Sequence, residues 1–270
     1  MLPGYVDGAP VAPRIVAALS VPVRTIPSID LLGMRISRVN RAETLEILQE
    51  FINSGKPHLV VTADASGHVI AAGDPEYRRI VNEAALVTPD STGILWAARK
   101  LGTPLEERVS GVDLAEQLCA ESARRGYGVY FYGAAPGVAE AAAETMRKRY
   151  PGANIVGTVD GFQNSPEQQA ALLADIKAKR PAVLLVAMGI PKQEKWIRQH
   201  LEELGVPVCM GVGGTFDVFS GRAKRAPLWM QRHGLEWLYR LIQNPKKYSK
   251  VATLPVFTLR VLLRRRLPGS

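Results

Sequence analysis

The sequence predicts an α/β protein with a mostly parallel sheet flanked by helices and a basic helical appendage at its C-terminal end. Residues 182–188 and 206–212 are short apolar runs rich in Val and Leu, and residues 192–204 between them have helical periodicity. From Gly128 onward, strand and helix patterns alternate as β-α-β-α-β-α-β. This alternation is typical of a Rossmann-like, nucleotide-binding half-sheet.

The remaining elements follow from apolar runs and from the residues that bound them. Residues 30–37 read as a strand with a glycine turn, and Ser66 and Asp74-Pro75 read as helix starts, the second with proline at the first helical position. Strands are expected at residues 58–62, 85–88, 129–132 and 154–159, and helices at residues 41–53, 94–101, 112–125, 138–150 and 166–179.

The length and composition of the chain limit how many domains it can form. A chain of 270 residues with 47% hydrophobic content can bury the core of one large domain with an appendage. Residues 1–28 hold five prolines and no basic start followed by an apolar run, so we expect a flexible leader and a cytoplasmic protein. The predicted division is a leader (1–28), an α/β domain (29–220) and a C-terminal appendage (221–270).

Positive charge is concentrated in the appendage. Residues 222–270 contain 12 Lys or Arg and one acidic residue, whereas the preceding 221 residues contain 22 basic and 24 acidic ones. Such a segment suits nucleic acid, anionic lipid or a phosphorylated substrate. Its apolar run, residues 251–263, is interrupted by Arg260 and is shorter than the roughly 20 residues that span a bilayer. It suits the surface of an anionic membrane, and an ordinary helix packed on the core is the alternative.

Several chemistries have no support in the sequence. Cys119 and Cys209 lie in apolar surroundings and are expected to be buried free thiols, and the four histidines have no metal-ligand spacing. The turn Gly133-Ala-Ala-Pro-Gly137 is not a GxGxxG motif, so no nicotinamide or flavin cofactor is inferred. The tryptophans at helical spacing, which are Trp196, Trp229 and Trp237, are expected to be packing residues.

Polar residues follow several of the predicted strands. Ligands of open α/β sheets bind outside the carboxyl ends of the strands. Gln193, in the first turn of its helix, and Asp217 can face a nucleotide there, although the same residues also suit ordinary turns and helix starts. Asp90 lies between a strand and a helix, where it is either a helix N-cap or a functional carboxylate.

Short polar motifs follow one another from about Ile29 to Tyr248. They are Thr62-Ala-Asp64, Pro89-Asp90, Arg108-Val-Ser-Gly111, Gly189-Ile-Pro-Lys-Gln-Glu-Lys-Trp196, Gly211-Val-Gly-Gly-Thr-Phe-Asp217, Gly221-Arg-Ala-Lys-Arg-Ala-Pro227 and Leu235-Glu-Trp-Leu-Tyr-Arg240. In this set and order the chain resembles glycosyltransferase family 26, the WecG/TagA/CpsF family. The resemblance implies an inverting transferase that uses a UDP-sugar donor and a polyprenyl-diphosphate-linked acceptor at the inner face of the plasma membrane.

The resemblance also implies roles for individual residues. Asp90 matches the family's proposed general base, and Thr62 matches a polar residue of the same pocket. Arginines are more usual in the family near Lys247 and Lys250, and lysine lacks the bidentate fork of arginine. The full set expected to bind substrate is Thr62, Asp64, Arg108, Gly133, Gly161, Gln193, Gly214, Asp217, Arg240, Lys247 and Lys250, with Arg222 and Arg225 in support.

The expected substrates are UDP-N-acetylmannosamine and undecaprenyl-diphosphate-linked N-acetylglucosamine, joined in a β-1,4 linkage for teichoic acid or another surface polysaccharide. The chain has no Asp-x-Asp pair, so we expect basic side chains rather than a metal to neutralise the diphosphate, and no cofactor. UDP-glucose, UDP-glucuronate and UDP-N-acetylmannosaminuronate stay open as donors. A nucleotide-binding regulatory protein is the alternative class; a nucleic-acid-binding protein lacks a recognition helix, and the apolar tail makes a homo-oligomer plausible.

Overall fold

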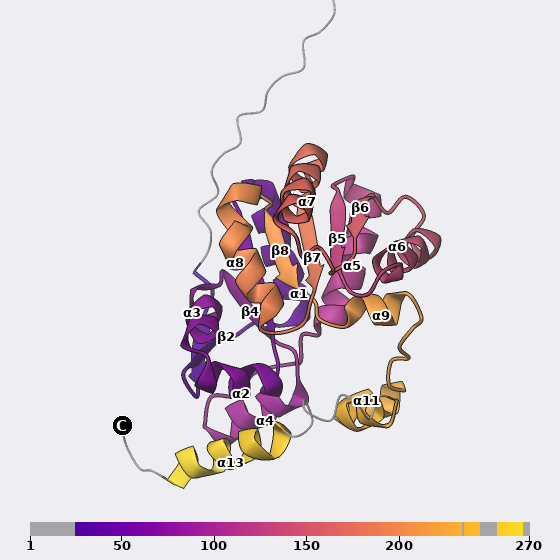
Figure 1. Ribbon diagram of the computed structural model, residues 1–270. Helices are drawn as coiled ribbons and strands as arrows, with labels where there is room; N and C mark the ends of the chain where they lie inside the picture. The colour runs from indigo at the N-terminus through magenta and orange to yellow at the C-terminus, as the bar shows by residue number, and fades with distance from the viewer. Residues whose placement is uncertain (1–24, 234, 244–252, 267–270) are drawn as a thin grey trace, which may run out of the picture.

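A six-stranded, all-parallel sheet forms the centre of the molecule, as a computed structural model shows for residues 25–233, 235–243 and 253–266 (Figure 1). The strand order is β4-β3-β8-β7-β5-β6. This sheet confirms the predicted Rossmann-like class. The strands are β3 (His58–Ala63), β4 (Leu86–Pro89), β5 (Val129–Gly133), β6 (Ile155–Val159), β7 (Val183–Ala187) and β8 (Val208–Gly211).

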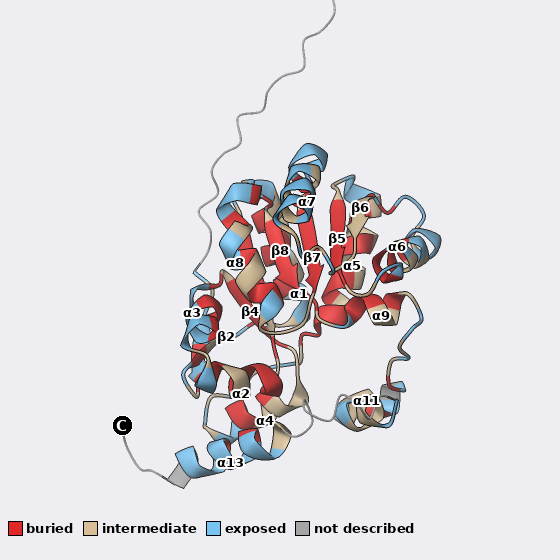
Figure 2. Cartoon of the chain, viewed as in Figure 1, coloured by how far each residue is buried: buried red, intermediate tan, exposed pale blue. Residues whose placement is uncertain are grey.

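Helices cover both faces of the sheet, and each face has its own core because successive side chains of a strand point to opposite sides (Figure 2). Leu184 and Val186 of β7 pack toward α8, whereas Val183 and Leu185 pack on the opposite face. The covering helices are α1 (Arg41–Ser54), α3 (Pro75–Glu83), α5 (Gly111–Arg125), α6 (Val138–Arg149), α7 (Pro166–Lys179) and α8 (Lys192–Leu204).

A separate antiparallel pair precedes the sheet. β1 (Ser28–Leu31) and β2 (Met34–Ser37) are joined by a turn in which Gly33 has a φ of 85°. The predicted strand with a glycine turn is therefore a hairpin. Ser37 Oγ accepts a 3.1 Å hydrogen bond from the backbone N–H of Val87, which ties the hairpin to β4.

The observed helix ends follow the capping chemistry of the sequence. Helices α7 and α8 begin and end where predicted, and most other elements differ from the prediction by one or two residues. Asp74 caps α3 by accepting a hydrogen bond from the N–H of Tyr77, with Pro75 at the first helical position. The helix expected near Ser66 is α2 (Ala65–Gly73), and its cap is Asp64.

The segment after Gly221 forms three described helices: α10 (Leu228–Arg232), α11 (Glu236–Gln243) and α13 (Thr253–Arg266). α13 packs across α2 and α4 (Thr92–Lys100) through Phe257 and Val261, which are fully buried. Among the helices that the structure describes, none combines the length and apolar content needed to cross a membrane. Most of the predicted leader, together with Lys247 and Lys250, lies outside the described residues.

Candidate active site

The main cavity of the described structure has a volume of about 770 Å³ and lies at the carboxyl ends of β3, β4 and β8. This size is typical of a site for a small organic ligand. Its polar lining includes the predicted residues Asp64, Asp90, Arg108, Gly214 and Asp217, and its remaining polar or charged groups are Ser66, Ser91, Thr92, Lys224, Arg225, His233, Glu236, Gln243 and Thr258.

The strand register places the first two carboxylates side by side. Ala63 of β3 pairs with Pro89 of β4, so Asp64 and Asp90 follow their strands at the same level. The N–H of Val109 donates to the carbonyl oxygen of Pro89 at 2.9 Å and thereby brings the neighbouring Arg108 to the same strand end. Three residues that the sequence separates by up to 44 positions thus meet at one corner of the cavity.

Asp90 is not the N-cap residue of the helix that follows it. The N-cap of α4 is Ser91, whose hydroxyl accepts a hydrogen bond from the N–H of Ile94 at 3.3 Å. Asp64, in contrast, caps α2 and accepts from the N–H of Gly67 at 2.8 Å. The Asp90 side chain is about one quarter exposed, at the cavity surface. A carboxylate in this position can accept a proton from a bound hydroxyl group.

Arg108 carries the positive charge closest to Asp90 among the described ion pairs. Its Nε lies 3.9 Å from Oδ1 of Asp90, and its Nη1 lies 2.9 Å from Oε2 of Glu236. Glu236 is the first residue of α11, so the C-terminal segment contributes directly to the charged corner. Sequence reasoning missed Glu236, although it lies inside the quoted motif Leu235-Glu-Trp-Leu-Tyr-Arg240.

A second ion pair joins the C-terminal segment to the α/β domain. Arg225 forms a bidentate pair with Asp113 of α5, with distances of 2.5 and 2.9 Å from its two terminal nitrogens. This pairing raises the pKa of Arg225. Arg225 also lines the cavity, whereas Arg222 is exposed outside its lining. Two ion pairs, Arg225–Asp113 and Glu236–Arg108, therefore join the cavity wall from Gly221 onward to the α/β domain.

Gln193 is buried rather than directed into the main cavity. Its Oε1 accepts hydrogen bonds from the N–H groups of Gly189 and Gly213, at 3.1 and 3.0 Å, and its Nε2 donates to Glu194 at 2.8 Å. A Cβ atom at Gly211 would lie 2.5 Å from that Nε2, so only glycine fits there. Gln193 thus joins the loops after β7 and β8, and its predicted contact with substrate is not part of this arrangement.

Three other predicted residues also lie outside the main cavity lining. Gly133 ends β5 and Gly161 follows β6, at the other half of the sheet edge. Gly133 has a φ of 118°, and a Cβ there would lie 2.6 Å from the backbone of Ala187, so the tight approach of β5 to β7 requires glycine. Thr62 donates its hydroxyl to the carbonyl oxygen of Gly211 at 3.2 Å.

Part of the cavity wall is apolar. It combines Trp96 of α4, Trp237 and Leu241 of α11, and Leu254 and Phe257 of α13. Trp237 is 41% exposed, so the expectation that it is an ordinary packing residue is wrong; Trp229 is likewise exposed, while Trp196 packs against Tyr132. These apolar residues were missed because their side chains converge only when three helices meet. The side chain of Arg240 lies outside the described part of the structure.

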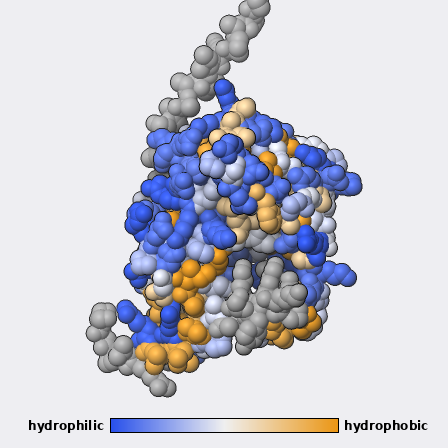
Figure 3. All heavy atoms as spheres, viewed as in Figure 1, coloured by the Kyte–Doolittle hydropathy of each residue, from blue (hydrophilic) through white to orange (hydrophobic). Residues whose placement is uncertain are grey.

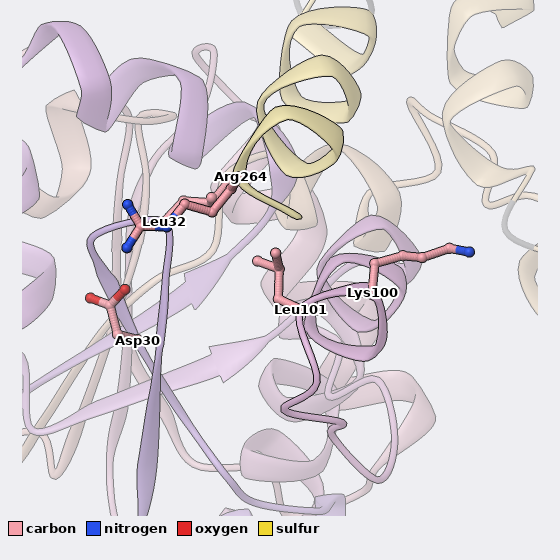
Figure 4. A pocket seen from close by; sticks show the side chains of 5 residues that line it. All are labelled: Asp30, Leu32, Lys100, Leu101 and Arg264. Atoms are coloured by element: carbon pink, nitrogen blue, oxygen red, sulfur yellow. The ribbon is translucent and has the colours of Figure 1, made fainter. Parts of the chain in front are cut away.

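A second cavity, of about 330 Å³, lies where α13 meets the β1–β2 hairpin and the end of α4. The Arg264 guanidinium lies on the same side as the Asp30 carboxylate, near Leu32, whereas the Lys100 amine extends away from them (Figure 4). The Lys100 amine therefore does not join the other two charged groups of this cavity.

The described residues include two buried thiols but no cluster of metal ligands. Cys119 and Cys209 are free and buried, as expected, and burial raises the pKa of the Cys119 thiol to about 12. Among the described side chains, no group of three or more His, Cys, Asp or Glu is arranged to hold a metal ion. Independence from metals stays a prediction for experiment.

Comparison with known proteins places this cavity in context. A model of the family described as glycosyl transferase WecG/TagA/CpsF matches residues 29–269. A protein of Bacillus spizizenii is 33% identical over 216 residues, covering 80% of this chain and 83% of its own; one of Staphylococcus aureus strain MW2 is 29% identical over 243 residues, covering 88% and 93%. Both are named N-acetylglucosaminyldiphosphoundecaprenol N-acetyl-beta-D-mannosaminyltransferase.

A third relative, from Bacillus subtilis strain 168, has the same name and is 32% identical over 192 residues, which is 71% of this chain and 74% of its own. The family model includes all the strands of the parallel sheet, the corner formed by Asp90 and Arg108, and the C-terminal helices that close the cavity. The chain therefore belongs to the glycosyl transferase WecG/TagA/CpsF family.

Proposed function

We propose that this protein transfers N-acetylmannosamine from UDP-N-acetylmannosamine to the C4 hydroxyl of undecaprenyl-diphosphate-linked N-acetylglucosamine, with inversion at the sugar. The product is a β-1,4-linked lipid disaccharide for teichoic acid or another surface polysaccharide. The printed name shared by the three relatives supports these substrates. The observation that carries the proposal is Asp90, a carboxylate that does not cap its helix and lines a cavity at the carboxyl ends of three strands.

The reaction needs one proton acceptor and one stabilised leaving group. Asp90 takes the proton from the acceptor hydroxyl, whose oxygen forms the new bond to the anomeric carbon. The bond from that carbon to the diphosphate oxygen breaks, and UDP leaves with the electron pair. Attack from the face opposite UDP inverts the anomeric centre.

Positive side chains around the cavity support stabilisation of UDP without a metal. Arg108, Lys224 and Arg225 line it, and Arg240 belongs to α11, the helix that also supplies Trp237 and Leu241. Cationic groups close to a diphosphate stabilise the charge that develops as the bond breaks. Lys247 and Lys250 remain predicted contributors to the same task.

The apolar wall and α13 support an acceptor attached to a lipid. Val256, Leu259, Leu262 and Leu263 are 40–57% exposed, although the opposite side of the same helix is buried through Phe257 and Val261. In Figure 3 hydrophobic side chains gather at the end of the molecule that holds α13. Exposed leucines next to Arg260 and Arg264 suit an anionic membrane surface. These features support the proposed location at the inner face of the plasma membrane.

The direct test is UDP release by the full-length protein with a short-chain polyprenyl-diphosphate-N-acetylglucosamine acceptor and a panel of UDP-sugars, with and without EDTA. The proposal expects acceptor-dependent release from UDP-N-acetylmannosamine that survives EDTA. Release only from another UDP-sugar would replace the donor and keep the chemistry. UDP binding without turnover of any donor would favour the non-catalytic, regulatory alternative.

Asp90→Asn should lower turnover by about 10²- to 10⁴-fold, because an amide cannot accept the hydroxyl proton. UDP affinity and melting temperature should stay near those of the wild type, since Ser91 rather than Asp90 caps α4. Asp74→Asn is the matched control, because Asp74 also lies at a helix start but outside the main cavity lining. Near-normal turnover of Asp90→Asn would remove Asp90 as the base.

A further inference from the structure

Arg108 lies between two carboxylates, Asp90 of the α/β domain and Glu236 of the C-terminal segment. Its contact with Glu236, at 2.9 Å, is an ion pair at hydrogen-bond distance, whereas its approach to Asp90, at 3.9 Å, is not. The Arg108, Glu236 and Asp90 side chains are 17%, 13% and 25% exposed. At such partial burial, a change in one charge alters the proton affinity of its neighbours.

We propose that Glu236 is a positioning residue that keeps Asp90 basic by holding the Arg108 guanidinium away from it. This inference rests on the proposed role of Asp90 as general base. A carboxylate in a close bidentate ion pair with arginine has a depressed pKa and commits its oxygens to the guanidinium. Such a carboxylate is a poor acceptor for a substrate proton.

Arg225, which lines the same cavity, holds a carboxylate in such a two-point contact. Arg225 and Asp113 form a two-point pair at 2.5 and 2.9 Å, so both oxygens of Asp113 are engaged. Arg108 has the same guanidinium group, and its Nε lies 3.9 Å from Oδ1 of Asp90. The difference at Arg108 is a second carboxylate, Glu236, which takes the shorter contact.

Other charged groups also line the cavity around Asp90. Asp64 faces the cavity from the start of α2, Asp217 from α9 (Thr215–Phe219), and Lys224, Arg225 and His233 from the C-terminal segment. Replacing Glu236 with glutamine removes one negative charge and keeps the side-chain shape. The resulting difference in acid–base behaviour reports the influence of Glu236 on Asp90, both through its charge and through its contact with Arg108.

Because Glu236 opens α11, the inference also connects the C-terminal segment to the chemical step. Docking of α11 supplies the carboxylate that engages Arg108, in addition to closing the cavity with Trp237 and Leu241. Without docked α11, Arg108 would turn to Asp90. The base would then be weakest when the cavity is open to water.

The test is the pH dependence of kcat/KM in the acceptor-dependent UDP release assay, measured for the wild type, Glu236→Gln and Glu236→Asp. Glu236→Gln should move the acidic limb to lower pH by about one unit, because Asp90 then carries the nearest negative charge to Arg108. Its turnover above the limb should fall by about three- to tenfold, since a weaker base accepts the proton less readily. Glu236→Asp keeps the charge and should restore most of the wild-type profile.

Asp113→Asn is the matched control because it breaks the other ion pair of the C-terminal segment without touching Arg108. It should leave the acidic limb in place, even where it lowers turnover. An unchanged limb in Glu236→Gln, or an equal shift in Asp113→Asn, would overturn the inference. The first would show that Asp90 does not sense Glu236, and the second that general loosening of the segment causes the shift.

A direct titration covers the case in which a variant has no measurable turnover. Carbon-13 NMR of aspartate carboxyl groups, assigned with Asp90→Asn, gives the pKa of Asp90 in the folded protein. A lower pKa in Glu236→Gln than in the wild type supports the inference, and an equal or higher pKa overturns it. A wild type without turnover would instead contradict the proposed function, while this titration still decides the role of Glu236.

Discussion

At the scale of single residues, the site depends on polar groups that act through the backbone as well as on those that line the cavity. Gln193 and Glu194 are 2% and 0% exposed and lie side by side at the start of α8. The Gln193 amide holds the two glycine loops, and its N–H donation to Glu194 sets which way the amide faces. This buried network fixes Gly213, and the next residue, Gly214, lines the cavity.

Gln193→Glu should lower the free energy of unfolding by about 2–4 kcal/mol, because it removes a buried hydrogen bond and sets two carboxylates side by side. The double variant Gln193→Glu/Glu194→Gln should recover at least half of the loss, since the new amide can donate to the new carboxylate. Urea unfolding at pH 7 measures both. Glu202→Gln, at an exposed position on the same helix, should change stability little; a double variant no more stable than Gln193→Glu would contradict the network.

At the scale of elements, α13 attaches to the α/β domain by a narrow buried stripe. Phe257 and Val261 are one helical turn apart, and they belong to the same core as α2 and α4. Phe257 also meets the ring of His68 edge-on, with 5.4 Å between ring centroids. The rest of α13 is largely exposed, so its docking depends on few side chains.

Val261→Ala should therefore loosen α13 by about 1–3 kcal/mol, from lost burial and the cavity left behind. Hydrogen exchange in residues 253–264 should accelerate, and exchange in the β7 and β8 core should stay unchanged. Leu259→Ala, on the exposed side of the same helix, is the control and should leave exchange near the wild-type rate. Equal acceleration by both substitutions would show that α13 is not held by this stripe.

At the scale of the whole molecule, the cavity is completed by two parts of the chain with different charge. The α/β domain contributes the strand ends with Asp64 and Asp90, and the segment after Gly221 contributes Arg225, Glu236 and the apolar wall. That segment also carries all of the excess positive charge of the chain, because the residues before it hold more acidic than basic side chains. One segment thus serves both the proposed catalytic cavity and the proposed membrane surface.

A chain that ends at Gly221 should lose turnover and binding to anionic phospholipid vesicles, while the six-stranded domain still unfolds in one cooperative transition. It should be less stable than the full chain, because removal of Phe257 and Val261 uncovers apolar surface on α2 and α4. Vesicle sedimentation at low and high salt, circular dichroism and UDP release measure the three properties. Full turnover by the shortened chain would contradict a catalytic role for the C-terminal segment.

The sequence by itself determined the fold class, because alternating apolar runs and helical periodicity are local and extend over many residues. It also predicted α7 and α8 to the residue, since Ser165-Pro166 and Gly205 are strong end signals. The family motifs pointed to Asp90 and Arg108. From the sequence alone Asp90 also suits a helix N-cap, because it lies between a strand and a helix; the structure assigns that cap to Ser91.

Only the tertiary structure decided which of these residues meet. The strand order sets β8 beside β3, so Gly214 and Asp217 join Asp64 and Asp90, whereas Gly133 and Gly161 fall at the far half of the sheet edge. Local sequence patterns do not encode strand order. The sequence also did not predict the burial of Gln193 or the contact of Glu236 with Arg108. Each depends on loops or helices brought together from distant parts of the chain.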